Sequence, residues 1–189
     1  MNQPIGEKIK LYRVSKDITV EQVAEITGLS KDLINKIEEN KIIPMLSYLI
    51  KIARSLGTRL GTFLDDNNEC SCVLTRADNA VESVRYLTSE KTCAGSLIFN
   101  SLGHNKKDRN MEPFLVTLKK DSINEKDNMS SHEGEEFIYV LKGKIGVKYG
   151  KDYYEINKGD SIYYDSAVMH NVHSLNNEEA DILAVIYMP

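Results

Sequence analysis

Apolar residues recur at helical spacing over residues 5–64 and predict a bundle of five short helices. Two helix starts are marked by capping side chains. Thr19, with Gln22 three residues later, has the arrangement of a capping box, and Ser30 can cap the helix that follows. Gly28 lies between these two helices, where a tight turn needs a positive φ. The pattern therefore predicts two helices joined by a turn in the middle of the bundle.

The apolar positions within each helix lie three and four residues apart, as one buried face requires. They are Ile5, Ile9 and Tyr12 in the first helix; Val23, Ala24 and Ile26 in the second; Leu33, Ile34 and Ile37 in the third; and Leu46, Leu49, Ile50, Ala53 and Leu56 in the fourth. Pro44 precedes the fourth helix and Gly57 ends it. A final turn is expected around residues 60–64.

Beyond residue 80 the apolar period becomes two, which is typical of β-strands. The clearest predicted strands are 137–141, 145–149, 153–156, 161–164 and 182–187. Lys142-Gly143 and Gly150-Lys151 have the composition of hairpin turns joining the first three of them. Short strands separated by frequent turn residues predict an all-β sandwich or barrel.

The change of period divides the chain into two domains. We expect a helical domain over residues 1–66, a linker over 67–80 and a β domain over 81–189. The linker prediction depends on the polar, irregular composition of that stretch. The helical part has 10 Lys and Arg against 9 Asp and Glu, a net charge of +1, and the remainder has 14 against 19, a net of −5.

Composition excludes several classes of protein. A net charge of −4 argues against nonspecific coating of nucleic acid or membrane. Cys70, Cys72 and Cys93 are odd in number and lack zinc-site spacing, which favours reduced thiols over a disulfide framework. Cys70-Ser71-Cys72 leaves a redox role open. No N-terminal apolar run resembles a signal peptide, and no apolar stretch approaches the length of a membrane span, so we expect a soluble, cytoplasmic protein.

The second and third predicted helices have the spacing of a DNA-binding helix-turn-helix. Ala24 is small enough for the helices to cross closely. Because Ser30 caps the third helix, Lys31, Asp32 and Asn35 project from its exposed N-terminal end, where base edges are read. The other predicted contacts with DNA, which would hold phosphates, are Asn40 and Lys41. The alternative is a helical dimerisation or scaffold module.

Residues 5–64 resemble the phage-repressor-like helix-turn-helix domain of xenobiotic-response-element-family regulators. The matching segments are Gly-Leu-Ser-Lys at 28–31, Ile-Glu-Glu-Asn at 37–40, Pro44 and the run at 49–57. Val20 stands where that family often has a glutamine that contacts DNA, which weakens binding there or shifts reading toward the third helix. One recognition helix reads few base pairs, so we expect a homodimer on a palindromic operator of double-stranded DNA.

A second set of residues has the spacing of a metal or ligand site. His132 and Glu136 lie four residues apart in a predicted strand and so share a face, and His170 follows later in the chain. Two imidazoles and one carboxylate can bind a divalent first-row metal and leave positions open for a substrate or oxygen. His132 and Glu136 can equally form hydrogen bonds in a polar pocket, and His170 can equally be a hydrogen-bonded histidine of the core. His104 and His173 have no such spacing and are expected to be structural or on the surface.

These residues lie in a stretch that resembles a cupin. The resemblance covers residues 111–189, and we expect it to begin as early as residue 81. His132, Glu136 and Gly143 match the first cupin motif, in which Ser130 replaces the first histidine. Gly159 and His170 match the second motif, although Asp165 and Ala167 stand where proline and glycine are commoner. The resemblance implies either one divalent metal, with Fe(II) as the first candidate and Mn, Ni or Zn as alternatives, or no metal.

The fold class expected is therefore α+β in separate domains: an all-α five-helix helix-turn-helix head followed by an all-β cupin (double-stranded β-helix, jelly-roll) barrel. Tyr139, Tyr163 and Tyr164 are expected to line its ligand pocket. The leading hypothesis is a transcriptional regulator, not an enzyme, whose cupin senses a small-molecule effector or a metal. The rival hypothesis is a mononuclear non-haem iron oxygenase or epoxidase that uses His132, Glu136 and His170, as in a few proteins of this layout.

Overall fold

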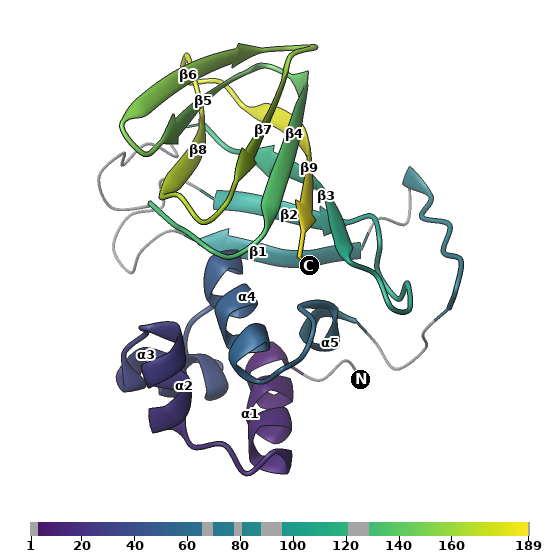
Figure 1. Ribbon diagram of the computed structural model, residues 1–189. Helices are drawn as coiled ribbons and strands as arrows, with labels where there is room; N and C mark the ends of the chain where they lie inside the picture. Colours follow the sequence, from purple (N-terminus) through teal and green to yellow (C-terminus); the bar gives the residue numbers. More distant parts are fainter. Residues whose placement is uncertain (1–3, 66–69, 78–80, 88–95, 121–128, 189) are drawn as a thin grey trace. The chain divides into compact units, whose positions relative to one another are not determined.

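The structure is a computed structural model that describes residues 4–65, 70–77, 81–87, 96–120 and 129–188. The chain divides into two compact units, Met1–Glu69 and Cys70–Pro189. The first unit is helical and the second is built of strands (Figure 1). This is the predicted fold class, a helix-turn-helix head followed by an all-β domain. No helix of the described residues is both long enough and apolar enough to span a membrane.

Five helices form the head, as the apolar spacing predicts. They are α1 (Ile5–Ser15), α2 (Val20–Thr27), α3 (Lys31–Glu38), α4 (Leu46–Ser55) and α5 (Gly61–Leu64). Their shared core contains most of the apolar residues expected from the spacing, together with Phe63. Ile26 is an exception. It was expected to point inward and is 65% exposed, because the short helix α2 buries only Val23.

The turn between α2 and α3 follows the predicted capping chemistry. Thr19 Oγ1 accepts a hydrogen bond from the Gln22 backbone amide at 3.2 Å. In return, Gln22 Oε1 accepts one from the Thr19 backbone amide at 2.7 Å. Gly28 ends α2 with φ of 71°. Ser30 then caps α3 by accepting from the Leu33 amide at 3.2 Å. The predicted capping box at Thr19 and the predicted cap at Ser30 are confirmed, and the Ser30 cap fixes where α3 begins.

The β domain consists of two antiparallel sheets. The larger sheet has the strand order β1-β2-β3-β9-β4-β7, and the smaller has the order β6-β5-β8. The strands are β1 (Val81–Leu87), β2 (Ser96–Ser101), β3 (Met111–Leu118), β4 (Glu135–Lys142), β5 (Lys144–Tyr149), β6 (Asp152–Asn157), β7 (Ser161–Asp165), β8 (His170–Ser174) and β9 (Ala180–Tyr187). Alternate residues of β3, β4 and β9 are buried, so the larger sheet turns one face to the core.

One predicted hairpin is present and one is not. The turn at Gly150 joins β5 and β6, which pair with each other. Gly143 lies between β4 and β5, but these strands belong to different sheets. A Cβ at Gly143 would lie 2.8 Å from the Glu179 carbonyl oxygen. The chain therefore passes from one sheet to the other at this glycine, and the hairpin prediction there was wrong.

Part of the predicted linker is attached to the β domain. The Cys70 amide donates to the Asn105 carbonyl at 2.9 Å, and the Lys107 amide donates to the Cys70 carbonyl at 2.8 Å. The Thr75 hydroxyl donates to the Leu102 carbonyl at 3.1 Å. Cys70 and Cys72 are free and exposed, and Cys93 lies outside the described residues.

Candidate metal centre and DNA-reading surface

The exposed end of α3 carries the residues predicted to read bases. Lys31, Asp32 and Asn35 are all exposed. Lys31 Nζ lies 3.2 Å from a carboxylate oxygen of Glu21, and Asp32 lies 3.0 Å from Lys36 Nζ. Exposed ion pairs of this kind contribute little free energy and can exchange for other partners. The predicted reading residues are thus together on one accessible end of a capped helix.

The two residues predicted to hold phosphate have different environments. Asn40 has φ of 56°, and its Oδ1 accepts a hydrogen bond from the Gly6 amide at 2.9 Å. This bond joins the segment after α3 to the start of α1, so Asn40 has a structural role. Lys41 is exposed, with its Nζ 2.6 Å from a carboxylate oxygen of Glu39. Both residues are exposed.

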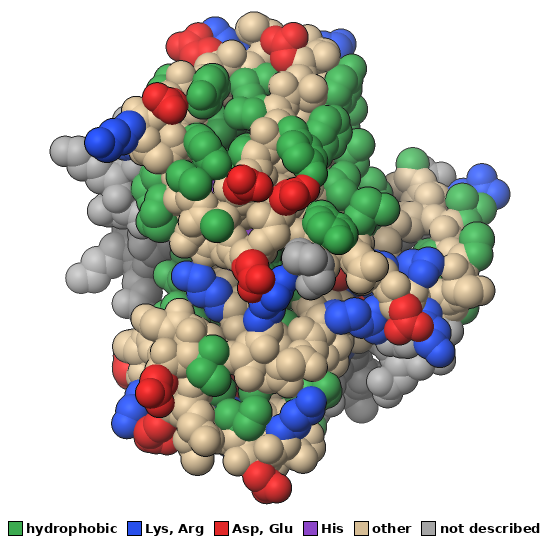
Figure 2. Space-filling view, in the orientation of Figure 1, with side chains coloured by type: hydrophobic (Ala, Val, Ile, Leu, Met, Phe, Trp, Pro, Cys, Tyr) green, Lys and Arg blue, Asp and Glu red, His purple; other side chains and the backbone are tan. Residues whose placement is uncertain are grey.

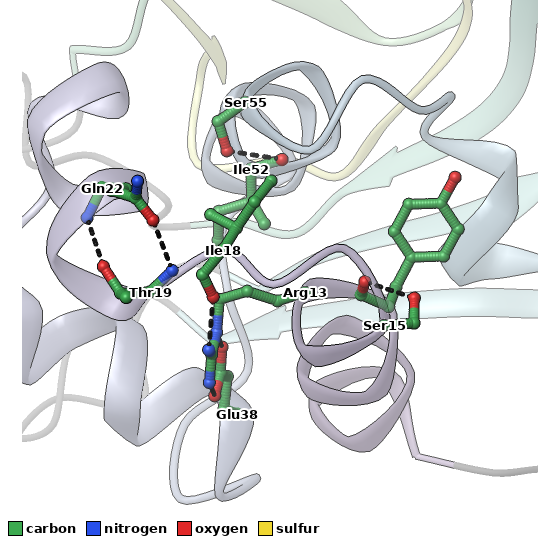
Figure 3. Close-up of polar contacts among 9 residues, drawn as sticks. Arg13, Ser15, Ile18, Thr19, Gln22, Glu38, Ile52 and Ser55 are labelled. Atoms are coloured by element: carbon green, nitrogen blue, oxygen red, sulfur yellow. Dashed lines mark hydrogen bonds and ion pairs between the residues drawn. The ribbon is translucent and has the colours of Figure 1, made fainter.

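A buried ion pair that the sequence analysis did not identify holds α3 in place. Arg13 Nε and Nη2 donate to the two carboxylate oxygens of Glu38 at 2.6 and 2.8 Å, and Arg13 Nη1 donates to the Ile18 carbonyl (Figure 3). The side chains of Arg13 and Glu38 are 11% and 3% exposed. The hydrogen bond to Glu38 raises the pKa of Arg13. The pair links α1, the turn after it and α3.

The β domain brings together the three predicted metal ligands. His132 lies just before β4, Glu136 lies in β4 and His170 begins β8. All three are buried, and one ligand atom from each lies within 4.8 Å of the others. Glu136 Oε1 lies 2.7 Å from His132 Nε2 and 3.6 Å from His170 Nε2. Among the described residues this is the one such group that the structure contains.

Both imidazoles are oriented by backbone carbonyl groups. His132 Nδ1 donates to the Glu133 carbonyl at 3.2 Å, and His170 Nδ1 donates to the Val168 carbonyl at 2.8 Å. A carbonyl oxygen can only accept, so each Nδ1 carries a proton. The Nε2 atoms, which face Glu136, are then the atoms that remain to bind a cation when the rings are neutral. This donor set fits one divalent metal ion.

The pKa values of Glu136, His170 and Tyr164 are shifted by burial and by the neighbouring groups of the cluster. Burial disfavours the charged carboxylate, but hydrogen bonds and charge from His132 and His170 outweigh this and lower the pKa of Glu136. Burial likewise opposes protonation of His170, yet Glu136 raises the pKa of that imidazole. Burial and then the charge of Glu136 raise the pKa of Tyr164 well above its usual range. Glu136 is therefore an anion, and Tyr164 is a neutral hydrogen-bond donor.

Only one of the three predicted pocket tyrosines lies at this cluster. The Tyr164 hydroxyl donates to Glu136 Oε2 at 2.6 Å. Tyr163 and Tyr139 occupy the alternate positions of β7 and β4, so they lie on the outer face of the sheet and are 63% and 37% exposed. Because adjacent strand residues face opposite sides, Tyr163 and Tyr164 cannot both line one pocket. Figure 2 shows hydrophobic side chains gathered on the surface of the β domain.

Ser130, His173 and His104 are not members of the three-residue cluster. Ser130, in the place of the first cupin histidine, exchanges two backbone hydrogen bonds with His170 at 2.8 and 2.9 Å. His173 is buried, with Nδ1 2.9 Å from Asn171 Oδ1 and Nε2 3.1 Å from the Tyr153 hydroxyl. His173 is thus a structural residue of β8. His104 is half-buried in the loop after β2.

Comparison with known proteins identifies both domains. Residues 9–63 match a family model described as a helix-turn-helix, and residues 114–186 match one described as a cupin domain. The HTH-type transcriptional regulator PuuR of Escherichia coli (strain K12) is 24% identical over 183 residues, which are 96% of this chain and 91% of PuuR.

Two solved structures show the same overall fold. An HTH_3 family transcriptional regulator from Vibrio cholerae is 23% identical, covers 100% of this chain and 97% of its own, and has a TM-score of 0.72. Fe(II) HppE in complex with substrate is 20% identical, covers 98% of this chain and 99% of its own, and has a TM-score of 0.51. The chain therefore carries a helix-turn-helix domain followed by a cupin domain, and it is similar over nearly its whole length to the regulator PuuR.

Proposed function

We propose that this protein is a sequence-specific DNA-binding transcriptional regulator whose cupin domain senses a divalent metal or a small molecule. The observation that carries the proposal is the exposed, capped end of α3 with Lys31, Asp32 and Asn35. Capped recognition helices of this kind enter the major groove with their N-terminal residues against base edges. The match of PuuR along nearly the whole chain supports the same function.

Within this proposal the contacts with DNA divide by type. Lys31, Asp32 and Asn35 read base edges, and Lys41 and the α3 N-terminus near Ser30 hold phosphates. Asn40 acts indirectly, because it fixes the segment after α3 against α1. A homodimer places two such helices on a palindromic operator with half-sites about one helical turn apart.

The effector site is the cluster of His132, Glu136 and His170. Two imidazole nitrogens and one carboxylate oxygen suit Fe(II), Mn, Ni or Zn, with Fe(II) the first candidate. A bound ion would supply a Lewis-acidic centre with open positions for an effector. His132 and His170 are already oriented by the Glu133 and Val168 carbonyl groups, so little reorganisation is needed to bind it.

The test of the regulator is selection of duplex DNA from a random library by the purified full-length protein at physiological salt. We expect enrichment of a two-fold symmetric site, with an affinity that falls steeply as salt rises. A folded protein that enriches no sequence, with and without added Fe(II), would contradict the proposal.

A second candidate function is that of a mononuclear iron oxygenase. It is favoured by the ligand set itself, because two histidines and one carboxylate with open positions are the ligands of many non-haem iron oxygenases. An oxygenase would retain stoichiometric iron and consume oxygen with a substrate, whereas a regulator that binds iron would not turn over oxygen. Oxygen consumption by the iron-loaded protein with a substrate therefore distinguishes the two.

A further inference from the structure

Tyr164 donates a hydrogen bond to the carboxylate of the candidate metal centre. It lies in β7 directly opposite Glu136 of β4, and it is 6% exposed. Its hydroxyl donates to Glu136 Oε2 at 2.6 Å. The ring of Tyr164 also lies against His170, with 5.1 Å between ring centroids. Tyr164 therefore contacts two of the three candidate ligands and contributes to the position of both.

The two oxygens of Glu136 have different partners. Oε1 faces both imidazoles, at 2.7 Å from His132 Nε2 and 3.6 Å from His170 Nε2. Oε2 accepts the hydroxyl of Tyr164. A strong, short hydrogen bond to one carboxylate oxygen fixes the rotation of the group. The carboxylate thus presents one oxygen, and not both, toward the two histidines.

Neighbouring side chains hold the Tyr164 ring. Tyr149 packs against it with 5.3 Å between ring centroids, and the Tyr149 hydroxyl donates to the Asp165 carbonyl at 3.2 Å. Tyr149 is itself opposite His170 in the pairing of β5 with β8. The hydroxyl of Tyr164 is therefore placed by packing of its ring against Tyr149 and His170.

We propose that Tyr164 is a positioning residue that makes Glu136 a one-oxygen ligand and so selects transition-metal ions over Ca²⁺. The inference rests on the proposed metal site. Ca²⁺ takes six to eight oxygen ligands and commonly chelates a carboxylate through both oxygens, whereas first-row transition ions accept imidazole nitrogens with a single carboxylate oxygen. Groups that orient a ligand from behind usually change metal affinity by about 10–100-fold when removed.

The test compares three tyrosine-to-phenylalanine variants of the full chain by titration with Co²⁺, whose visible absorption reports its coordination. Tyr164→Phe removes the hydroxyl bonded to Glu136, and we expect a loss in Co²⁺ affinity of about 10-fold or more and an altered absorption spectrum. Tyr163→Phe is the matched control, since Tyr163 is the adjacent residue and lies on the outer face. Tyr149→Phe is a second control, because it removes a neighbouring hydroxyl and keeps the ring that packs against Tyr164. Both controls should bind Co²⁺ as the unaltered protein does.

Competition in the unaltered protein tests selectivity without any substitution. Excess Ca²⁺ should leave the Co²⁺ spectrum unchanged, and displacement by Ca²⁺ would overturn the inference. A Tyr164→Phe protein with unchanged affinity and spectrum would overturn it as well, as would an equal loss in Tyr149→Phe. If no form binds Co²⁺, the proposed metal site itself fails and the role of Tyr164 fails with it. Binding by the unaltered protein therefore separates the two failures.

Discussion

At the scale of single residues, side chains in the segment Ile-Glu-Glu-Asn at 37–40 hold the fold together. Ile37 is in the core, Glu38 is paired with Arg13, and Asn40 accepts from the Gly6 amide. These residues of the segment, which match repressor-like domains, therefore serve the packing of the head. The residues that face solvent, Asn35 among them, remain available for DNA.

Replacement of Glu38 by alanine should strongly destabilise the head. Arg13 would remain largely buried without its carboxylate partner, and loss of one partner of a buried ion pair typically costs about 3 kcal/mol or more. Chemical denaturation monitored by circular dichroism measures the change. Glu39→Ala is the control, because the Glu39–Lys41 pair is exposed and its loss should change stability by less than about 1 kcal/mol. Equal effects of the two substitutions would refute this role for Glu38.

Replacement of Asn35 by alanine should reduce the preference for the selected operator while the fold persists. Asn35 is exposed on α3, so its truncation leaves the core intact, and loss of one base contact typically costs about 1–3 kcal/mol of discrimination. Competition between operator and scrambled duplexes measures selectivity. Glu25→Ala, an exposed change on α2, serves as the control. Unchanged selectivity in Asn35→Ala would mean that α3 does not read the bases.

At the scale of elements, periodicity identified all five helices and the five most regular strands. Capping residues placed the ends of α2 and α3, because these ends depend on nearby side chains. The sheet partners of each strand depend on contacts distant in sequence, so the turn composition at Gly143 predicts a hairpin where the chain instead changes sheets. The three candidate ligands were found from motif spacing. The role of Tyr164 depends on its register opposite Glu136, and that register becomes clear only in the folded sheet.

The approach of α1 to α3 depends on a glycine that the periodicity does not mark. A Cβ at Gly6 would lie 2.0 Å from the Ile37 carbonyl oxygen, a backbone atom that cannot move aside. Gly6→Ala should therefore force the helices apart, at a cost of about 3 kcal/mol. Gly28→Ala meets no atom within 4 Å and should cost about 1 kcal/mol, from its positive φ alone. Thermal unfolding of both variants measures the difference, and a milder effect at Gly6 would contradict the close packing.

At the scale of the whole molecule, the residues proposed to bind DNA and those proposed to bind the effector lie in separate units with separate cores. The buried residues of the head include Ile9, Ile34 and Leu49, whereas those of the β domain include Phe114 and Ile138. A substitution at the candidate metal centre should leave the packing of the head unchanged. The proposed function therefore makes DNA binding and its regulation separable by mutation.

Replacement of both His132 and Glu136 by alanine tests this separation. Operator affinity without effector should stay close to that of the unaltered protein, because the head retains its core and its reading surface. The change in operator affinity on adding Fe(II) should be lost, because the cation would keep one of its three protein ligands. In a regulator the coupling between two such sites is usually about 1–3 kcal/mol, a factor of about 5–150 in affinity. Fluorescence anisotropy with labelled operator, with and without Fe(II), measures both quantities. An unaltered response to Fe(II) in the double variant would place the sensing site elsewhere in the chain.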